Sequence, residues 1–403
     1  MKKIIPASIL ALIAIYALFH AYTNRNVGSF FWGVSCLLII LAIYARILKN
    51  TIIILISITA TLALVENALS WMQEWQKNTG SGPFAYFDSA QTYNTPAYWQ
   101  LGPFGLQPRP GVFTAIKMAA PNKPVYDVVF TIGPDGFRLT PQYGWGQRSG
   151  DGLHSLPKRV NFFGDSFTFG EGVQDNQTLP YYFALHENSE KKPLTLVKNY
   201  GIHGWGMQQA LAIIQSPLDT KAELQFALTA PWHASRSACA DSFSLGSPKY
   251  KLLDDGLVAR NGYCRSFGWV EHSPKPVRAL ITFSKIFNLI QDSLLVTKDQ
   301  DEQVRLYLGI LRTIHAELSA RGQKLILGFI KADEHWFVGS YNNEKILSEI
   351  KSMGIQTIDM TLADKNENLD PKYFIHELDK HPSAAGQNAR ALLLVRHLQS
   401  ARN

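Results

Sequence analysis

The sequence is poor in cysteine and in charge. Only three cysteines occur in 403 residues, and their spacing does not match the ligand spacing of structural zinc sites. Charged residues make up 18% of the chain, a small share for a wholly soluble protein, whereas apolar residues make up 46%. There is no internal repeat and no low-complexity tract, which excludes a repeat architecture.

A concentrated basic segment is also absent. The chain has 39 Lys and Arg against 32 Asp and Glu, a net charge of +7, but the basic residues are scattered. No zinc finger or aromatic RNA-binding signature is present, so nucleic acid is not an expected partner. The excess of positive charge could bind an acidic partner such as an anionic glycan or a lipid headgroup. It could instead only maintain solubility and flank the membrane segments. We favour the second interpretation.

The apolar excess lies at the start of the chain. Residues 4–22, 28–45 and 51–70 are three apolar runs, each of about 18 to 20 residues, which is enough to cross a bilayer. A cleaved signal peptide would explain only the first run, and a clear cleavage site is lacking. We therefore predict a three-helix membrane anchor in residues 1–72, with Glu66 near the interface.

The orientation of this anchor follows from Lys and Arg in the short flanking segments. Lys2 and Lys3 precede the first run, Arg46 and Lys49 separate the second from the third, and Arg25 alone separates the first from the second. The N-terminus is therefore expected in the cytoplasm. Three crossings of the inner (plasma) membrane then place the rest of the chain in the periplasm or outside the cell.

A β-prone run at 160–163 ends in Gly164-Asp165-Ser166, and a glycine-rich turn follows. Ser166 is then expected at the carboxyl end of a strand, where open α/β sheets bind ligands. There it can expose its hydroxyl and offer its own N–H to an oxyanion. The alternative is a polar turn, because Gly-Asp-Ser also occurs by chance. The turn lacks the Gly-Lys-Ser/Thr ending of a phosphate-binding loop.

A candidate base lies near the end of the chain, in Asp379-Lys380-His381-Pro382. A nucleophilic serine needs an imidazole to take its proton, and the imidazole needs a carboxylate to fix its tautomer. We expect His381 in a loop that enters the last helix. The alternatives are a surface Asp and His at a helix cap, or a metal site with His376; we expect no metal.

These motifs resemble those of the SGNH (GDSL-type) hydrolases. Residues 164–167, Gly-Asp-Ser-Phe, resemble block I, residues 199–206, Asn-Tyr-Gly-Ile-His-Gly-Trp-Gly, resemble block II, and residues 379–382 resemble the last block. The resemblance covers about residues 155–403. It implies a flavodoxin-like three-layer α/β/α domain that needs no cofactor.

The resemblance also implies roles for individual residues. Ser166 would be the nucleophile, His381 the base and Asp379 the acid that orients it. The N–H groups of Ser166 and Gly204 would hold the oxyanion. His203, next to Gly204, could contact substrate or simply shape the turn.

One block departs from the family pattern. The third strand runs into Pro231-Trp232-His233, without the Asn that usually completes the oxyanion hole. His233 falls at that place, and its ring N–H could donate to an oxyanion. Arg236 could stabilise the same charge or bind an acidic group of the substrate. Both residues could instead be structural.

Two of the cysteines, Cys239 and Cys264, fall outside the apolar runs. In an oxidising compartment they are expected to form a disulfide. It would close a loop of about 25 residues and stabilise the fold by roughly 3 kcal/mol. The pair lies in a long insertion, 232–300, whose place beside the expected cleft suggests a part in substrate choice. Cys36 is expected to be a small apolar filler of the second run.

The remaining sequence divides at about residue 155. Residues 73–155 predict a small β-rich extension and linker, with a strand at 125–132, a turn at 133–136, a returning strand at 137–140 and a mobile connector at 144–152. The extension could line the cleft or cover a sheet edge, and we favour the second. Residues 156–403 alternate strands and helices, as a parallel sheet requires. The strands are predicted at 160–163, 194–197, 224–230, 324–330 and 356–359, and the helices near 179–186, 208–214, 304–320 and 344–353. A last helix is expected to start at Pro382-Ser383 and to carry the apolar-periodic run 389–398.

The expected function is that of a membrane-anchored serine esterase or O-acyltransferase. The substrate would carry an O-acyl ester, such as acetyl, on an envelope glycan or lipid. Water as acceptor gives an esterase, and a sugar hydroxyl gives a transferase, with a membrane acyl-donor protein as a possible partner. The alternative is a catalytically degenerate SGNH-type fold that binds carbohydrate or assembles the envelope.

Overall fold

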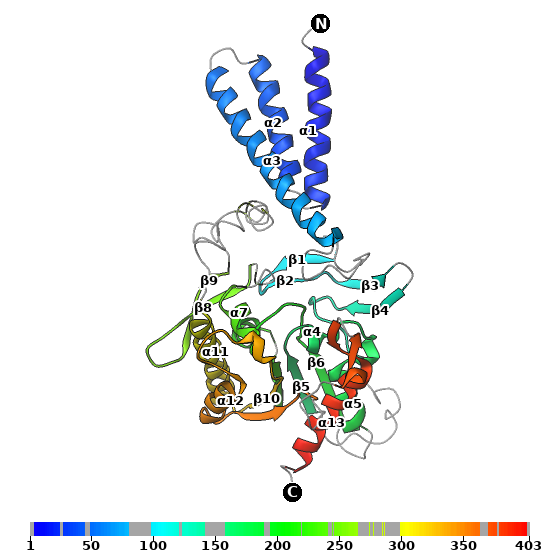
Figure 1. The fold of residues 1–403 in the computed structure, drawn as a ribbon, viewed down its shortest axis with the longest axis vertical. Coiled ribbons are helices and arrows are strands. Elements are labelled where there is room, and N and C mark those ends of the chain that lie inside the picture. The colour runs from blue at the N-terminus through cyan, green and yellow to red at the C-terminus, as the bar shows by residue number, and fades with distance from the viewer. Residues whose placement is uncertain are drawn as a thin grey trace. The chain divides into compact units, whose positions relative to one another are not determined.

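The computed structural model divides the chain into two compact units (Figure 1). One comprises Met1–Phe87 and Arg265–Leu295, and the other comprises Asp88–Cys264 and Val296–Asn403. The structure describes residues 4–24, 27–44, 49–79, 98–120, 123–141, 158–188, 194–218, 220–240, 246–264, 299–362, 370–376 and 379–400, and single residues 244, 274, 277, 284 and 286.

The described part of the first unit includes the long helices α1 (Ile4–Asn24), α2 (Val27–Tyr44) and α3 (Lys49–Thr79). Among the described residues, Ile53–Met72 of α3 is long and apolar enough to cross a membrane. The apolar segments Leu10–His20 and Val27–Ile40 are shorter. The structure therefore supports one of the three predicted spans by length and composition, and the other two stay predictions.

The three helices pack in sequence, α1 on α2 and α2 on α3. Ser35 and Thr59 join α2 to α3 through a hydroxyl–hydroxyl hydrogen bond of 2.7 Å. Glu66 of α3 is only 1% exposed. Its Oε1 accepts hydrogen bonds from the Ser284 hydroxyl and, at 3.1 Å, from the backbone N–H of Ile286. Protein groups thus surround the Glu66 carboxylate, and its expected place near the membrane interface stays a prediction.

The second unit is built on a five-stranded sheet in which every neighbouring pair is parallel. When the five strands of this sheet are numbered by their order in the chain, their order across the sheet is 2-1-3-4-5. This is the flavodoxin-like order, so the predicted fold class is confirmed. In their order across the sheet, the strands are β6 (Thr195–Asn199), β5 (Lys158–Phe163), β7 (Leu224–Thr229), β10 (Lys324–Phe329) and β11 (Gln356–Asp359).

Helices cover both faces of this sheet and make three layers (Figure 1). Successive side chains of a strand point to opposite faces. Phe226 of β7 accordingly lies in one apolar core, and the next residue, Ala227, lies in the other. One face carries α5 (Leu179–Asn188) and α13 (Ala384–Ser400), and the other carries α6 (Met207–Gln215), α11 (Gln300–Ala320) and α12 (Asn343–Ser352).

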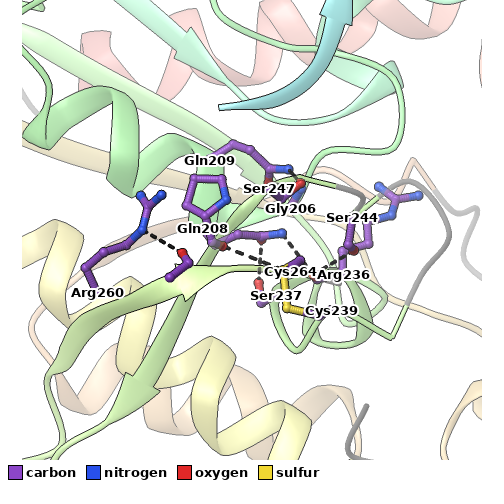
Figure 2. The surroundings of a disulfide bond; sticks show 12 residues. Gly206, Gln208, Gln209, Arg236, Ser237, Cys239, Ser244, Ser247, Arg260 and Cys264 are labelled. Atoms are coloured by element: carbon purple, nitrogen blue, oxygen red, sulfur yellow. Dashed lines mark hydrogen bonds between the residues drawn. A yellow bond between two sulfur atoms is a disulfide. The ribbon is translucent and has the colours of Figure 1, made fainter. Parts of the chain in front are cut away.

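A disulfide joins Cys239 to Cys264, with their Cα atoms 5.2 Å apart, which confirms the predicted pair. It ties the chain after α7 (His233–Ser237) to the end of a hairpin, β8 (Pro248–Leu252) and β9 (Val258–Tyr263). Beside it, Gln208 of α6 donates to the Arg236 carbonyl and accepts from the Ser237 hydroxyl (Figure 2). Most of the predicted insertion beyond residue 264 lies outside the described residues.

Two further hairpins precede the sheet. They are β1 (Trp99–Gly102) with β2 (Gly105–Pro108), and β3 (Gly111–Ala120) with β4 (Lys123–Ile132). The expected return of 137–140 onto β4 is confirmed over a short stretch only, at the antiparallel bridge Ile132–Arg138 and through the Leu139 N–H, which donates to the Thr131 carbonyl. The full-length partner is β3. The expected mobile connector at 144–152 lies outside the described residues.

The described part of the second unit also contains short elements. They include α4 (Ser166–Phe169), the paired strands β12 (Phe374–His376) and β13 (Asp379–Pro382), and the single 3-10 turns η2 (Asp175–Gln177), η4 (Glu334–Trp336) and η5 (Pro371–Tyr373). His381 thus lies on a strand rather than in the predicted loop, because β13 pairs with β12 directly before α13 begins.

Candidate active site

Ser166 lies where β5 ends and α4 begins, at the carboxyl edge of the parallel sheet. Asp165 caps α4, because its Oδ1 accepts the Phe167 N–H at 2.9 Å. Gly164 has φ +152°, and a Cβ there would lie 2.3 Å from Thr168 Oγ1 and 2.9 Å from the Leu228 carbonyl oxygen. Only glycine fits this sharp turn, which presents Ser166 at the end of the strand.

The structure brings Ser166, His381 and Asp379 into one hydrogen-bonded chain. The Nε2 atom of His381 lies 2.8 Å from Ser166 Oγ, and its Nδ1 lies 2.5 Å from Asp379 Oδ1. The same Oδ1 accepts the backbone N–H of His381 at 3.0 Å. The strand β13 therefore supplies both the imidazole that contacts the Ser166 hydroxyl, 215 residues earlier in the chain, and the carboxylate that contacts this imidazole.

Lys117 of β3 contacts the other oxygen of Asp379, with its Nζ 2.7 Å from Oδ2. The Asp379 side chain is only 2% exposed, so the ion pair is shielded from water. The extension therefore contributes a charged group to the site. This contact supports the interpretation that we favoured less, in which the extension lines the cleft.

Glu171 is a second carboxylate beside the imidazole. Its Oε2 lies 3.3 Å from His381 Nε2 and 2.9 Å from Nδ1 of His203. The Tyr126 hydroxyl donates to its Oε1 at 3.4 Å. Glu171 is 8% exposed. Its position five residues after Ser166, in the same glycine-rich turn, was the only sequence signal that could have placed it here.

These neighbours set the charge of the site. Burial disfavours the imidazolium, but the charge of Glu171, and the hydrogen bond and charge of Asp379, raise the pKa of His381 to about 9. Burial alone would raise the pKa of Asp379, yet His381 and Lys117 hold that pKa well below its usual range. Despite burial, the charges of His381 and His203 likewise lower the pKa of Glu171.

The predicted oxyanion role of His233 does not match its contacts. His233 is 1% exposed, with Nε2 3.1 Å from Asp165 Oδ2 and Nδ1 3.1 Å from Thr229 Oγ1. Both ring nitrogens face groups of the protein rather than the space in front of Ser166. His233 holds the residue that caps α4, so it is not the replacement for the missing Asn.

Arg236 also binds Asp165 instead of facing substrate. Its Nη1 donates to Asp165 Oδ2 at 2.7 Å and to the Trp205 carbonyl at 3.1 Å. The indole N–H of Trp232, a residue that sequence reasoning missed, donates to the same Oδ2 at 3.1 Å. Burial would raise the pKa of Asp165, but His233 and Arg236 hold that pKa well below its usual range.

The second motif lies against the serine turn. The Asn199 side chain donates to the Thr168 carbonyl at 3.0 Å and accepts the Gly201 N–H at 2.9 Å. The Ile202 N–H lies 3.3 Å from the Gly164 carbonyl oxygen. Gly204 follows on this loop with φ +71°, a conformation that favours glycine.

His203 is buried rather than placed to touch substrate. It is 6% exposed, its ring centroid is 4.0 Å from that of Phe169, and its Nε2 lies 3.5 Å from the Tyr98 hydroxyl. Its Nδ1 contact with Glu171 gives it a supporting position instead. The predicted substrate contact is therefore wrong for the described conformation.

Arg138 anchors the turn that carries Glu171. Its guanidinium, with no side-chain exposure, donates to the carbonyls of Phe169, Gly170 and Val173 at 3.1, 2.6 and 2.7 Å. Its Nε lies 2.8 Å from the Asp175 carboxylate. The segment after β4 thus fixes the backbone on both sides of Glu171.

Among the residues that the structure describes, no group of three His, Cys, Asp or Glu could hold a metal ion.

No family model matches the sequence, and no curated protein matches it. Among solved structures, the chain is similar to a member of the lipolytic G-D-S-L family from Veillonella parvula and to a lipase/acylhydrolase from Enterococcus faecalis. The chain is also similar to an acetylxylan esterase, Axe2, from Geobacillus stearothermophilus.

The identities to these three proteins are 13%, 16% and 14%, and the TM-scores are 0.33, 0.35 and 0.35. The matches cover 59%, 60% and 59% of this chain and 96%, 96% and 93% of the three solved chains, in the same order.

Proposed function

We propose that the second unit is a serine hydrolase of SGNH type that acts on ester bonds. The observation that carries this proposal is the hydrogen-bonded chain from Ser166 through His381 to Asp379, at the carboxyl edge of a parallel sheet. A hydroxyl, an imidazole and a buried carboxylate in this order are the parts that acyl transfer needs.

In the proposed reaction, Ser166 Oγ attacks the ester carbonyl carbon while His381 Nε2, 2.8 Å away, takes the hydroxyl proton. Asp379 keeps the other proton of the ring on Nδ1 and stabilises the imidazolium. The tetrahedral intermediate then expels the alcohol, which receives the proton from Nε2. An acyl group remains on Ser166 for transfer to an acceptor.

The oxyanion is proposed to bind the backbone N–H groups of Ser166 and Gly204. Both lie on turns that the structure holds tightly, one by the Asp165 cap and the other by Asn199 and the Ile202 N–H. Donors that are fixed before the reaction stabilise developing charge at little reorganisation cost. A two-donor pocket without the usual Asn is therefore the expected arrangement.

The cellular setting is part of the proposal. The apolar Ile53–Met72 segment supports attachment to a membrane, and the Cys239–Cys264 disulfide supports an oxidising compartment. We infer a three-span anchor in the plasma membrane with the catalytic unit in the periplasm or outside the cell. The substrate would be an acyl ester, such as acetyl, on an envelope glycan or lipid, with a sugar hydroxyl or water as acceptor. A membrane protein that donates the acyl group would be a partner for the transferase reaction.

Labelling with a fluorophosphonate probe tests the enzyme assignment. The full-length chain in detergent should be tagged, Ser166→Ala should lose the tag, and His381→Gln should be tagged at least about 100 times more slowly. Ser352→Ala, on an exposed residue of α12, is the matched control and should be tagged like the native chain.

The degenerate alternative predicts a different result. Its support is the position of His233, which leaves the pocket without the side-chain donor that usually follows the third strand. A folded native chain that takes no tag at any pH, yet binds envelope glycan, would replace the enzyme proposal with a binding role.

A further inference from the structure

Glu171 has no part in the three-residue mechanism, yet it lies on the reacting side of the imidazole. His381 Nε2 is 2.8 Å from Ser166 Oγ and 3.3 Å from Glu171 Oε2, so the one atom that handles protons faces both groups. Asp379, by contrast, binds the opposite nitrogen. After Ser166 is acylated, the acceptor molecule takes the place of the serine hydroxyl at Nε2. The Glu171 carboxylate then lies next to that acceptor.

We propose that Glu171 determines which acceptor takes the acyl group, by accepting a second hydrogen bond from the attacking molecule. The proposal rests on the proposed function, since it concerns the acyl-enzyme at Ser166. The favoured acceptors are those with two adjacent donors, namely water and a hydroxyl that has a second hydroxyl on the next carbon. A simple monohydric alcohol is disfavoured.

The chemical reason lies in the number of protons. Once Ser166 carries the acyl group, its Oγ has no proton, and Nε2 must take one from the acceptor. The acceptor oxygen therefore lies against Nε2 and within reach of Glu171 Oε2. A monohydric alcohol gives its only hydroxyl proton to Nε2, so its lone pairs then face a carboxylate that can only accept. Water has a second proton for Glu171, and a vicinal diol has a second hydroxyl.

The surrounding groups prevent Glu171 from turning away. His203 contacts the same Oε2 at 2.9 Å, and Tyr126 donates to Oε1. Arg138 holds the Gly170 carbonyl at 2.6 Å, directly before Glu171 in the chain. A carboxylate fixed by such contacts is in place before the acceptor arrives, which is the condition for effective orientation.

The proposed transfer step balances. The acceptor O–H proton moves to Nε2 as the acceptor oxygen forms a bond to the acyl carbon. The bond between that carbon and Ser166 Oγ then breaks, and the proton on Nε2 passes to Oγ. The second O–H group of the acceptor molecule donates a hydrogen bond to Glu171 and keeps its proton throughout the step.

A partition experiment on the full-length chain tests this inference. The enzyme is acylated with p-nitrophenyl acetate, and the acetyl group is shared between methanol and ethane-1,2-diol at equal hydroxyl concentration. A hydrogen bond to a charged group is worth roughly 10- to 150-fold in rate. The native chain should therefore favour the diol by at least about tenfold per hydroxyl, and Glu171→Gln should bring the ratio within about twofold.

Controls separate the possible failures. Glu344→Gln makes the same change on the exposed face of α12 and should keep the native ratio. Glu171→Asp keeps the charge and should retain part of the preference; it also serves if Glu171→Gln does not fold. A native chain that shows no p-nitrophenol burst refutes the proposed function. A normal burst with the same product ratio in the native chain and in Glu171→Gln refutes only the acceptor role.

Discussion

The charges around His381 predict an unusual pH dependence. His381 must be neutral at Nε2 to take the proton of Ser166, and its pKa is raised to about 9. The rate of fluorophosphonate labelling should therefore rise with pH and reach half of its maximum near the same value. At neutral pH only a small fraction of the molecules should be competent to react.

Removing one carboxylate should increase activity at neutral pH. The charge of Glu171 is the first of the influences that raise the pKa of His381, and Oε2 lies 3.3 Å from Nε2. Two unit charges at this distance interact by about 1.3 kcal/mol even at a dielectric constant of about 80, which corresponds to about one pH unit. Partial burial strengthens the interaction. Glu171→Gln should thus lower the midpoint by at least about one pH unit and speed labelling at pH 7 by about tenfold.

Substitution of Lys117 should shift the midpoint of the pH profile in the opposite direction. The positive charge of Lys117 disfavours the nearby imidazolium and lowers the pKa of His381. The ion pair with Asp379 holds the Lys117 ammonium in place. Lys117→Met should therefore move the midpoint to higher pH. The remaining charged or titratable groups near the imidazole, Asp379 and His203, are unchanged in both variants.

The assay is the labelling rate constant measured from about pH 6 to about pH 10, corrected for the folded fraction of each variant. It reports one chemical step, so acceptor binding and product release do not enter. A native midpoint near neutrality would refute the charge arrangement described here. So would equal midpoints for the native chain and Glu171→Gln, or shifts of the same sign in the two variants.

Three other outcomes are expected. Arg138→Met should lower the free energy of unfolding by about 3 to 5 kcal/mol in a denaturant titration, because it removes a buried cation from the Asp175 carboxylate and several carbonyls. Replacing Cys239 and Cys264 together by Ser should lower it by about 3 kcal/mol, whereas an unchanged value would show that the bridge is not formed in solution. His233→Ala should reduce stability by about 1 to 3 kcal/mol and slow labelling by less than about tenfold; a loss of 100-fold or more in the folded protein would restore the oxyanion role.

The sheet was predictable because parallel strands that are buried on both faces leave a strong local pattern. The predicted strand at 356–359 coincides with β11, and the one at 324–330 differs from β10 (Lys324–Phe329) by a single residue. Helix boundaries were less accurate: α11 begins at Gln300, four residues before the predicted start near residue 304. The apolar period shows which face is buried, whereas the first turn of this helix, residues 300–303, carries only polar residues.

The parts of the site that escaped prediction are pairings between distant side chains. Lys117 and Asp379 are 262 positions apart, and no local pattern indicates that one will neutralise the other. His233 shows the converse problem. Its place in the chain suggested an oxyanion donor, but Asp165 is a buried carboxylate that needs donors, and that need becomes visible only once β5 and β7 lie side by side.

The Lys117 contact also bears on where the chain can be cut. A boundary near residue 155 is natural from the sequence, but such a truncated protein would lose the cation on Asp379 and the guanidinium that fixes the turn after Ser166. Soluble fragments for crystallisation or screening should therefore start upstream of Tyr98. An inactive shorter fragment would say nothing about the chemistry of the intact protein, since its amputated hairpins belong to the catalytic apparatus.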